Sequence, residues 1–204
     1  IEIILEGFND TQSNYGVNVA SDGEQFAELN CEAYGALYQD VMTVPGTTLN
    51  WRFDHLARQL DDQSYRAEDT MAMVIMPADQ ADEVAQELQE AATTYRNNPV
   101  QAIQEIKNIL NGLEGRPGCY VYEATDGTYN AEKDWQTHKS TADTAYTVPE
   151  DQYLTRFFFV SVDAAYDHRN NADKTKYGTV GNLIDNVWFS THAQPPANDE
   201  AQLT

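Results

Sequence analysis

The stretch Thr48-Leu49-Asn50-Trp51-Arg52-Phe53-Asp54 alternates apolar and polar side chains along its whole length. Successive side chains of a β-strand point to opposite faces, so Leu49, Trp51 and Phe53 are expected to share one buried face. Residues 70–76 (TMAMVIM) are nearly apolar throughout and predict a strand in the centre of a sheet. A half-buried strand and a central strand together predict a β-sheet that packs on a hydrophobic core.

Further short strands are expected on both sides of these two. The sequence predicts them at 1–5, 25–30, 36–41, 119–122, 153–162 and 182–189. Turn sequences such as Val44-Pro45-Gly46 separate them, residues 125–128 are expected to turn, and residues 133–143 are expected to be irregular. Short strands at this spacing predict an all-β sandwich.

The period of the apolar residues changes to that of a helix after residue 78. Residues 79–95 predict an amphipathic helix with Asp79 as its N-cap and an apolar stripe of Ala81, Val84, Leu88, Ala91 and Tyr95. Pro99 suits the first turn of a second helix that Gly112 ends, with a stripe of Val100, Ile103, Ile106 and Leu110. Neither helix is long enough to be stable alone, so the pair must pack on each other or on the sandwich.

The charge of the chain excludes several classes of partner. Among 204 residues there are 33 acidic and 12 basic side chains, which gives a formal net charge of −21. Binding to nucleic acid and docking on anionic lipid both need clustered Lys and Arg, so neither is expected. No stretch approaches the roughly 18 apolar residues that a membrane span needs.

The two cysteines, Cys31 and Cys119, do not form a metal-ligand pattern. Two interpretations stay open for them: a long-range disulfide, or two buried free thiols that act as small core residues. A chain poor in Lys and rich in Tyr, Asn, Thr, Asp and Gln suits an extracellular surface protein of a microbe.

The order of several segments resembles a known family. The segments are 22–30 (DGEQFAELN), 37–40 (LYQD), 44–48 (VPGTT), 51–55 (WRFDH) with Arg58, 69–72 (DTMA) and 181–187 (GNLIDNV). Together they resemble the galactose-binding-like jelly-roll modules of surface proteins of Gram-positive gut bacteria, which are distant relatives of carbohydrate-binding modules. The resemblance implies a mainly β, jelly-roll β-sandwich, and the predicted α-helical hairpin, which departs from the family pattern, is expected to be inserted into it. We expect a single domain over 1–191, with the insertion at 78–118 and a linker or tail at 192–204.

The expected function is recognition without catalysis. The sequence contains no HExxH, GxSxG, GxxxxGK[ST] or GxGxxG signature, and its four histidines are scattered. We expect an adhesin-type recognition module of a secreted or cell-wall-attached bacterial protein, whose ligand is a glycan or a host surface molecule. An enzyme is not expected.

A group of polar residues near strand ends belongs to the pattern that carries the resemblance. It consists of Glu28, Asn30, Asp54, Arg58 and Asp69. In one interpretation Arg58 and a carboxylate bind sugar hydroxyls while Trp51 or Tyr38 stacks on the sugar ring. In the other, which we favour, these residues form a structural polar network in which Arg58 neutralises Asp54 or Glu28. Asp185 lies where related carbohydrate-binding modules have an acidic residue that supports a structural calcium ion.

The helical hairpin has two working interpretations. It is either a structural cover that packs Val84, Leu88, Ile103 and Ile106 on the sandwich, or a surface for a protein partner. The stretch Asn97-Asn98-Pro99-Val100-Gln101 loosely resembles the helical immunoglobulin-binding repeats of staphylococcal protein A. That similarity implies contact with a host protein such as an immunoglobulin through Gln86, Gln89, Glu90, Arg96, Asn97, Gln101 and Gln104. A membrane-active pair conflicts with the acidic polar face.

Overall fold

The computed structural model of the chain describes residues 20–23, 25–29, 35–57, 68–95, 98–127, 134–163 and 181–192. In chain order its elements are β1 (Ala27–Glu28), β2 (Ala36–Met42), β3 (Thr48–Leu56), β4 (Glu68–Pro77), α1 (Ala78–Thr94), α2 (Pro99–Asn111), β5 (Tyr120–Gly127), β6 (Gln136–Lys139), β7 (Tyr146–Thr147), β8 (Leu154–Asp163) and β9 (Leu183–Ser190). No helix among the described residues has the length and apolar character needed to cross a membrane.

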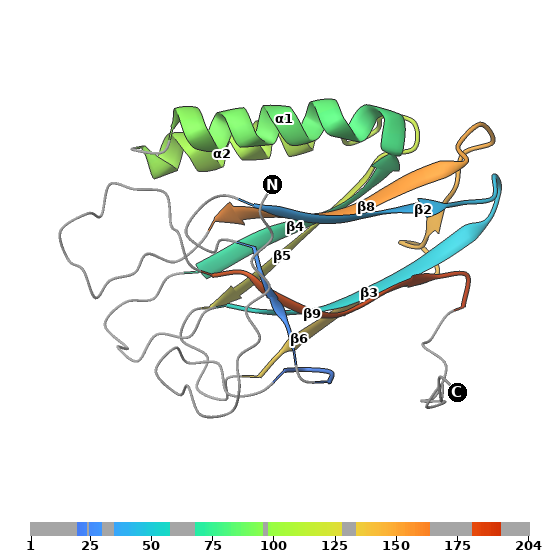
Figure 1. Ribbon diagram of the computed structural model, residues 1–204, viewed down its shortest axis with the longest axis horizontal. Helices are drawn as coiled ribbons and strands as arrows, with labels where there is room; N and C mark the ends of the chain where they lie inside the picture. The colour runs from blue at the N-terminus through green and yellow to red at the C-terminus, as the bar shows by residue number, and fades with distance from the viewer. Residues whose placement is uncertain are drawn as a thin grey trace.

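The strands form two antiparallel sheets that face each other (Figure 1). One sheet has the order β1-β9-β3-β6, with β7 paired to β3, and the other has the order β2-β8-β4-β5. Each of the connections β1–β2, β2–β3 and β3–β4 carries the chain from one sheet to the other. The predicted fold class, a mainly β jelly-roll sandwich with an inserted helical hairpin, is confirmed.

The core between the sheets follows the alternation of β3. Leu49, Trp51 and Phe53 all point into it, as predicted. Opposite them lie Met71, Met73 and Ile75 of β4 together with Phe157 and Phe159 of β8. The rings of Phe53 and Phe159 meet edge to face with centroids 5.2 Å apart, a favourable geometry for aromatic pairs.

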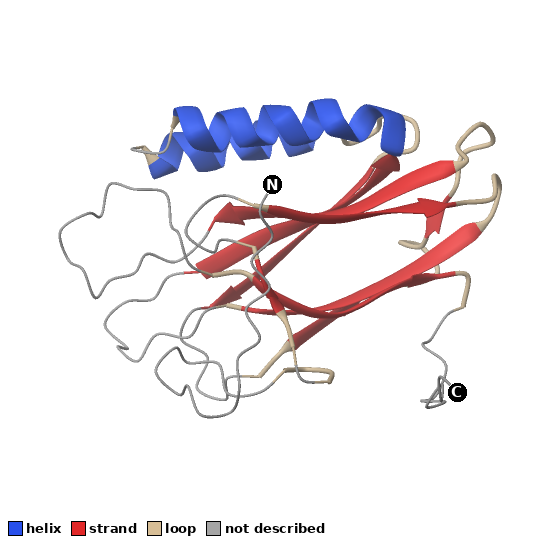
Figure 2. Cartoon of the chain, in the orientation of Figure 1, coloured by secondary structure: helices blue, strands red, loops and turns tan. Residues whose placement is uncertain are grey.

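Strand β4 is buried on both faces, which explains its apolar sequence. Its other set of side chains, Ala72, Val74 and Met76, packs against the two helices together with residues of β8. The helices lie over the β2-β8-β4-β5 sheet on the side away from β3, β6 and β9, so the molecule has three layers (Figure 2). The prediction of a central strand is confirmed, since β4 lies between β8 and β5.

The helical hairpin connects two strands that are neighbours in one sheet, since Ile75 of β4 pairs with Tyr120 of β5. Val84 and Leu88 of α1 and Ile106 of α2 are buried against the sheet, and Ile103 is partly buried there. The packing that the structural-cover interpretation required is therefore present.

Two details of the predicted helices are wrong. Pro77 occupies the N-cap of α1 without a side-chain cap, and Asp79 lies in the first turn instead. Val100 is 77% exposed, because α2 begins at Pro99 and turns its second residue away from the sheet. Ala102, which is buried, takes its place in a stripe with Ile106 and Leu110.

The strand boundaries also differ in places. β5 continues to Gly127, so the turn predicted at 125–128 is wrong, and β6 forms within the segment expected to be irregular. β6 is an edge strand that pairs only with β3 among the described strands. Its sequence is polar throughout, so it lacks the alternation of apolar and polar side chains that predicts a strand. β1 has two residues. The predicted strand at 1–5 and most of the predicted tail lie outside the described residues, and the bounds of the domain stay a prediction.

Cys119 is a free, half-buried thiol, and burial raises its pKa above the ordinary value. Cys31 lies outside the described residues.

Candidate functional site

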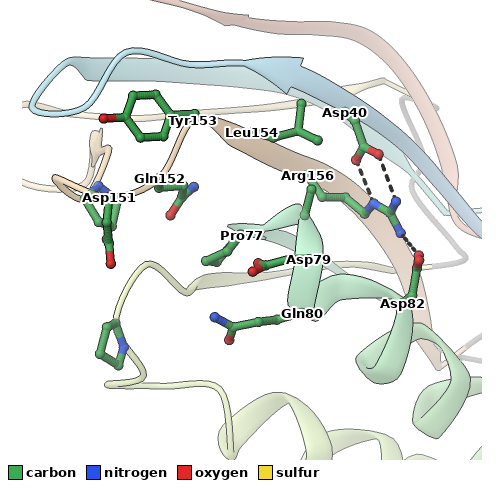
Figure 3. A pocket seen from close by; sticks show the side chains of 13 residues that line it. Asp40, Pro77, Asp79, Gln80, Asp82, Asp151, Gln152, Tyr153, Leu154 and Arg156 are labelled. Atoms are coloured by element: carbon green, nitrogen blue, oxygen red, sulfur yellow. Dashed lines mark hydrogen bonds and ion pairs between the residues drawn. The ribbon is translucent and has the colours of Figure 1, made fainter.

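A groove of about 520 Å³ opens where the start of α1 meets β2 and β8 (Figure 3). It is lined by Asp40, Pro77, Ala78, Asp79, Gln80, Asp82, Pro117, Pro149, Asp151, Gln152, Tyr153, Leu154 and Arg156. These residues come from four separate parts of the chain, and most of them are polar. We call this feature the α1–β8 groove.

The floor of the groove is the part of the sheet that the helices leave uncovered. Phe158, Val160 and Val162 of β8 pack under the hairpin. Arg156 and Leu154 lie two and four positions before Phe158, so they point to the same face of the sheet. β2 continues this face, since Asp40 pairs with Arg156 and Met42 with Leu154.

Arg156 joins three elements in the groove wall. Its Nε and Nη2 donate to the two carboxylate oxygens of Asp40 at 2.7 and 2.9 Å, and its Nη1 donates to Asp82 of α1 (Figure 3). Its Cζ lies 4.2 Å from the ring centre of Tyr38, a cation–π contact. The hydrogen bond from Arg156 lowers the pKa of Asp40, and the same bond raises the pKa of Arg156. Two carboxylates therefore neutralise this guanidinium, and it holds the hairpin on the sheet.

The other groove residues offer groups to a ligand. Asp79, Gln80 and Asp151 are exposed, and Tyr153 is 63% exposed. Buried Gln152 has a structural role instead, because it accepts a hydrogen bond from Tyr146 and donates one to Thr155. Carboxylates accept hydrogen bonds, an amide both donates and accepts, and an aromatic ring packs on apolar C–H faces. Such a set suits a ligand rich in hydroxyl groups.

The predicted sugar site is not assembled in one place. Trp51 is 1% exposed, and its Nε1 donates to the Thr144 carbonyl at 3.0 Å, so its ring has no free face for a sugar. Tyr38, the other predicted stacking ring, is 46% exposed. Asn30 and Arg58 lie outside the described residues.

Glu28 and Asp69 bind backbone where β9 begins. Glu28 accepts the N–H of Gly181 at 2.8 Å, and fully buried Asp69 accepts the N–H of Asn182 at 3.2 Å. The amide of Asn182 donates to the Thr70 and Asp163 carbonyls and to Ser161. Gly181 has φ +131°, and a Cβ there would overlap the Asp69 carboxylate. These contacts tie β9 to β4 and β8, as the structural-network interpretation expects.

Asp54 and Asp185 hold the turn before β1. Asp54 accepts hydrogen bonds from the hydroxyls of Ser21 and Thr137 and from the amide of Asn186. Burial acts to raise the pKa of Asp54, but these hydrogen bonds outweigh it and the pKa is lowered. Asp185 accepts the backbone N–H groups of Ser21 and Asp22 at 2.7 and 2.9 Å.

The calcium site at Asp185 stays a prediction. Among the residues that the structure describes, no three His, Cys, Asp or Glu side chains are grouped closely enough to hold a metal ion.

The predicted partner-binding face of the hairpin also stays a prediction. Its described members Gln86, Gln89, Glu90, Gln101 and Gln104 are all exposed. Gln86 donates to Glu90 of the same helix at 2.8 Å. Arg96 and Asn97 lie outside the described residues.

Sequence reasoning missed the α1–β8 groove and its residues Asp79, Gln80, Asp151 and Tyr153. One signal was available: Arg156 is the only charged residue in the apolar run 154–162. A buried cation needs carboxylate partners, so it marks the place where other segments must meet.

Comparisons with known proteins leave the family open. No family model and no curated protein matches the chain. A solved structure described as "CBM4 structure and function" is 14% identical, with 92% of each chain covered and a TM-score of 0.40. TmCBM61 in complex with beta-1,4-galactotriose is 9% identical, with 84% of this chain and 73% of that chain covered and a TM-score of 0.38. These similarities are too low to carry an argument, so the strand order alone establishes the fold.

Proposed function

We propose that the chain is a non-catalytic glycan-recognition module that binds a neutral sugar chain in the α1–β8 groove. The observation that carries the proposal is the groove itself, which combines about 520 Å³ of space with convergent polar groups and an exposed aromatic ring. Ligand sites typically combine concave shape with a few placed polar groups.

The charges of the groove favour a neutral ligand over an acidic one. Four carboxylates, those of Asp40, Asp79, Asp82 and Asp151, line it together with one guanidinium. Arg156 is already paired with two of these carboxylates, so it is not available to an anion. A negatively charged sugar would meet like charges at short range, which costs free energy.

The wider role is that of an adhesin-type module of a secreted or wall-attached protein. The acidic excess of the chain supports it, because a high net charge keeps a surface module soluble.

The groove proposal is tested with a glycan array followed by calorimetry on the neutral oligosaccharides that bind. Tyr153→Ala is expected to weaken binding at least about tenfold, or about 1.4 kcal/mol, while Tyr153→Phe keeps the ring and the affinity. Gln80→Ala is expected to weaken binding as well. Gln136→Ala, at another exposed glutamine, on β6, is the matched control and is expected to leave the affinity unchanged. Equal affinity of all four variants would contradict the proposal.

A host protein such as an immunoglobulin, bound on the outer face of the hairpin, is the second candidate. The exposure of Gln89 and Glu90 supports it. The double variant Gln89→Ala/Glu90→Ala would then reduce capture of that protein from serum, while glycan binding stays intact.

A further inference from the structure

The outer face of the other sheet carries a row of three side chains, one on each of three neighbouring strands. Arg52 of β3 pairs with Lys139 of β6 on one side and with Trp188 of β9 on the other. Their chain neighbours Trp51, Phe53 and Phe189 pack in the core between the sheets. Because side chains alternate along a strand, the row points away from the core. Lys139 is exposed, and Arg52 and Trp188 are partly exposed.

The two cations of the row lie directly opposite each other, which is an unfavourable arrangement. Like charges at facing positions of an antiparallel pair destabilise a sheet. The chain has 12 basic against 33 acidic side chains, so a carboxylate partner would be the expected neighbour. Within the described part of the chain, Lys139 has no ion pair. Within the described residues, the charge of Lys139 is therefore unpaired.

Arg52 is paired more weakly than Arg156. Its one ion pair within the described residues is with Asp54, at 3.8 Å, and Asp54 already accepts three hydrogen bonds. Its Nε is buried without a hydrogen-bond partner. A guanidinium prefers the two-pronged hydrogen bonding of a carboxylate, which Arg156 has and Arg52 lacks.

We infer that this row is a second ligand site, distinct from the α1–β8 groove, that binds a uronic-acid residue of an acidic polysaccharide. The Trp188 ring packs on the C–H face of the sugar ring while Arg52 and Lys139 bind its carboxylate. Asn50 and Ser190, which pair beside the row, offer hydrogen bonds to hydroxyl groups. The net charge of −21 opposes an anion at long range, but at 0.15 M salt the screening length is about 8 Å, so the nearest charges decide.

The inference is tested by calorimetry of the whole chain with oligogalacturonate at 0.15 M salt. Trp188→Ala is expected to weaken binding about tenfold or more, and Lys139→Gln about fivefold, with Lys139→Arg restoring the affinity. Lys107→Gln removes the same charge from α2, on the other side of the molecule, and is expected to leave the affinity unchanged. The groove variant Tyr153→Ala is also expected to bind oligogalacturonate normally. The proposal for this site and the proposal for the groove are therefore tested independently.

Three results would overturn the inference. The first is equal loss in Lys139→Gln and Lys107→Gln, which would mean nonspecific attraction. The second is tighter binding of dextran sulfate than of oligogalacturonate, which would mean a sulfate site. The third is no binding of oligogalacturonate by the unmodified chain. If Trp188→Ala has a lowered melting temperature, the comparison of the two lysine variants decides.

Discussion

Arg156 and Arg52 both point outward from strands, but their surroundings give them different roles. Arg156 is nearly buried and donates to carboxylates on two other elements, β2 and α1. Among the described residues, Arg52 has a single, longer ion pair, with Asp54. Arg156 stabilises the protein, whereas the buried Nε of Arg52 has no hydrogen-bond partner among the described residues.

At Arg156 we expect the two carboxylate partners to contribute unequally. Arg156→Gln removes the charge-assisted hydrogen bonds to both Asp40 and Asp82 and is expected to lower the free energy of unfolding by about 1–3 kcal/mol. Asp82 is 85% exposed, so Asp82→Asn is expected to cost less than about 0.5 kcal/mol. Urea unfolding of the two variants measures both values, and equal losses would contradict this assignment.

His55 is expected to make the protein less stable in mild acid. Its side chain is fully buried, and burial lowers its pKa from 6.5 to about 4. Asn182 donates through its amide nitrogen, so its Oδ1 accepts from the Nε2–H of a neutral His55. The unfolded chain takes up this proton at higher pH than the folded protein. Stability therefore falls as the pH drops from 6.5 to about 4, by roughly 3 kcal/mol in all.

Unfolding measured between pH 7 and 4 tests this expectation. His138, whose pKa is also lowered chiefly by burial, adds to the loss. Asp126, whose pKa burial raises, opposes it. The lowered pKa values of Asp40 and Asp54 reduce stability chiefly below about pH 5, where the carboxylates of the unfolded chain begin to take up protons. His55→Gln is expected to reduce the slope, and an unchanged slope would contradict the role of His55.

At the scale of elements, the hairpin is held by its apolar stripe. Leu88 and Ile106 are fully buried against the sheet. Leu88→Ala and Ile106→Ala are each expected to lower the free energy of unfolding by about 2–5 kcal/mol, since each leaves a cavity. Val100→Ala, on an exposed position of the same hairpin, is the control and is expected to change it by less than about 0.5 kcal/mol. Chemical denaturation distinguishes these outcomes.

The elements that were predicted best from the sequence are those whose apolar residues follow one clear pattern. β3 alternates, β4 is buried on both faces, and α1 repeats at three- and four-residue steps. The polar edge strand β6 has no such period, so only its pairing with β3 defines it. The groove could not be predicted, because Asp40, Asp79 and Tyr153 lie far apart in sequence. They meet only through the pairing of β2 with β8 and the packing of α1 on the sheet.

The whole molecule places its two proposed sites on opposite sides. The groove opens on the helix-covered side of the β2-β8-β4-β5 sheet, and the row of Trp188, Arg52 and Lys139 faces outward from the other sheet. The sandwich core lies between them, so bound ligands do not touch. We expect a saturating neutral oligosaccharide to leave the affinity for oligogalacturonate unchanged. Competition in a calorimetric titration would show that the two ligands share one site.

The helical connection between β4 and β5 has a consequence for the rate of folding. Ile75 of β4 pairs with Tyr120 of β5 although the two residues are far apart in sequence. Their pairing must close a long loop, and this closure costs entropy. α1 and α2 contact each other through neighbouring segments, so they form at low contact order. We expect them to form early and to bring the ends of both strands together before the sheet forms. The hairpin thus acts as an internal template, and weakening its helix–helix contacts should slow refolding.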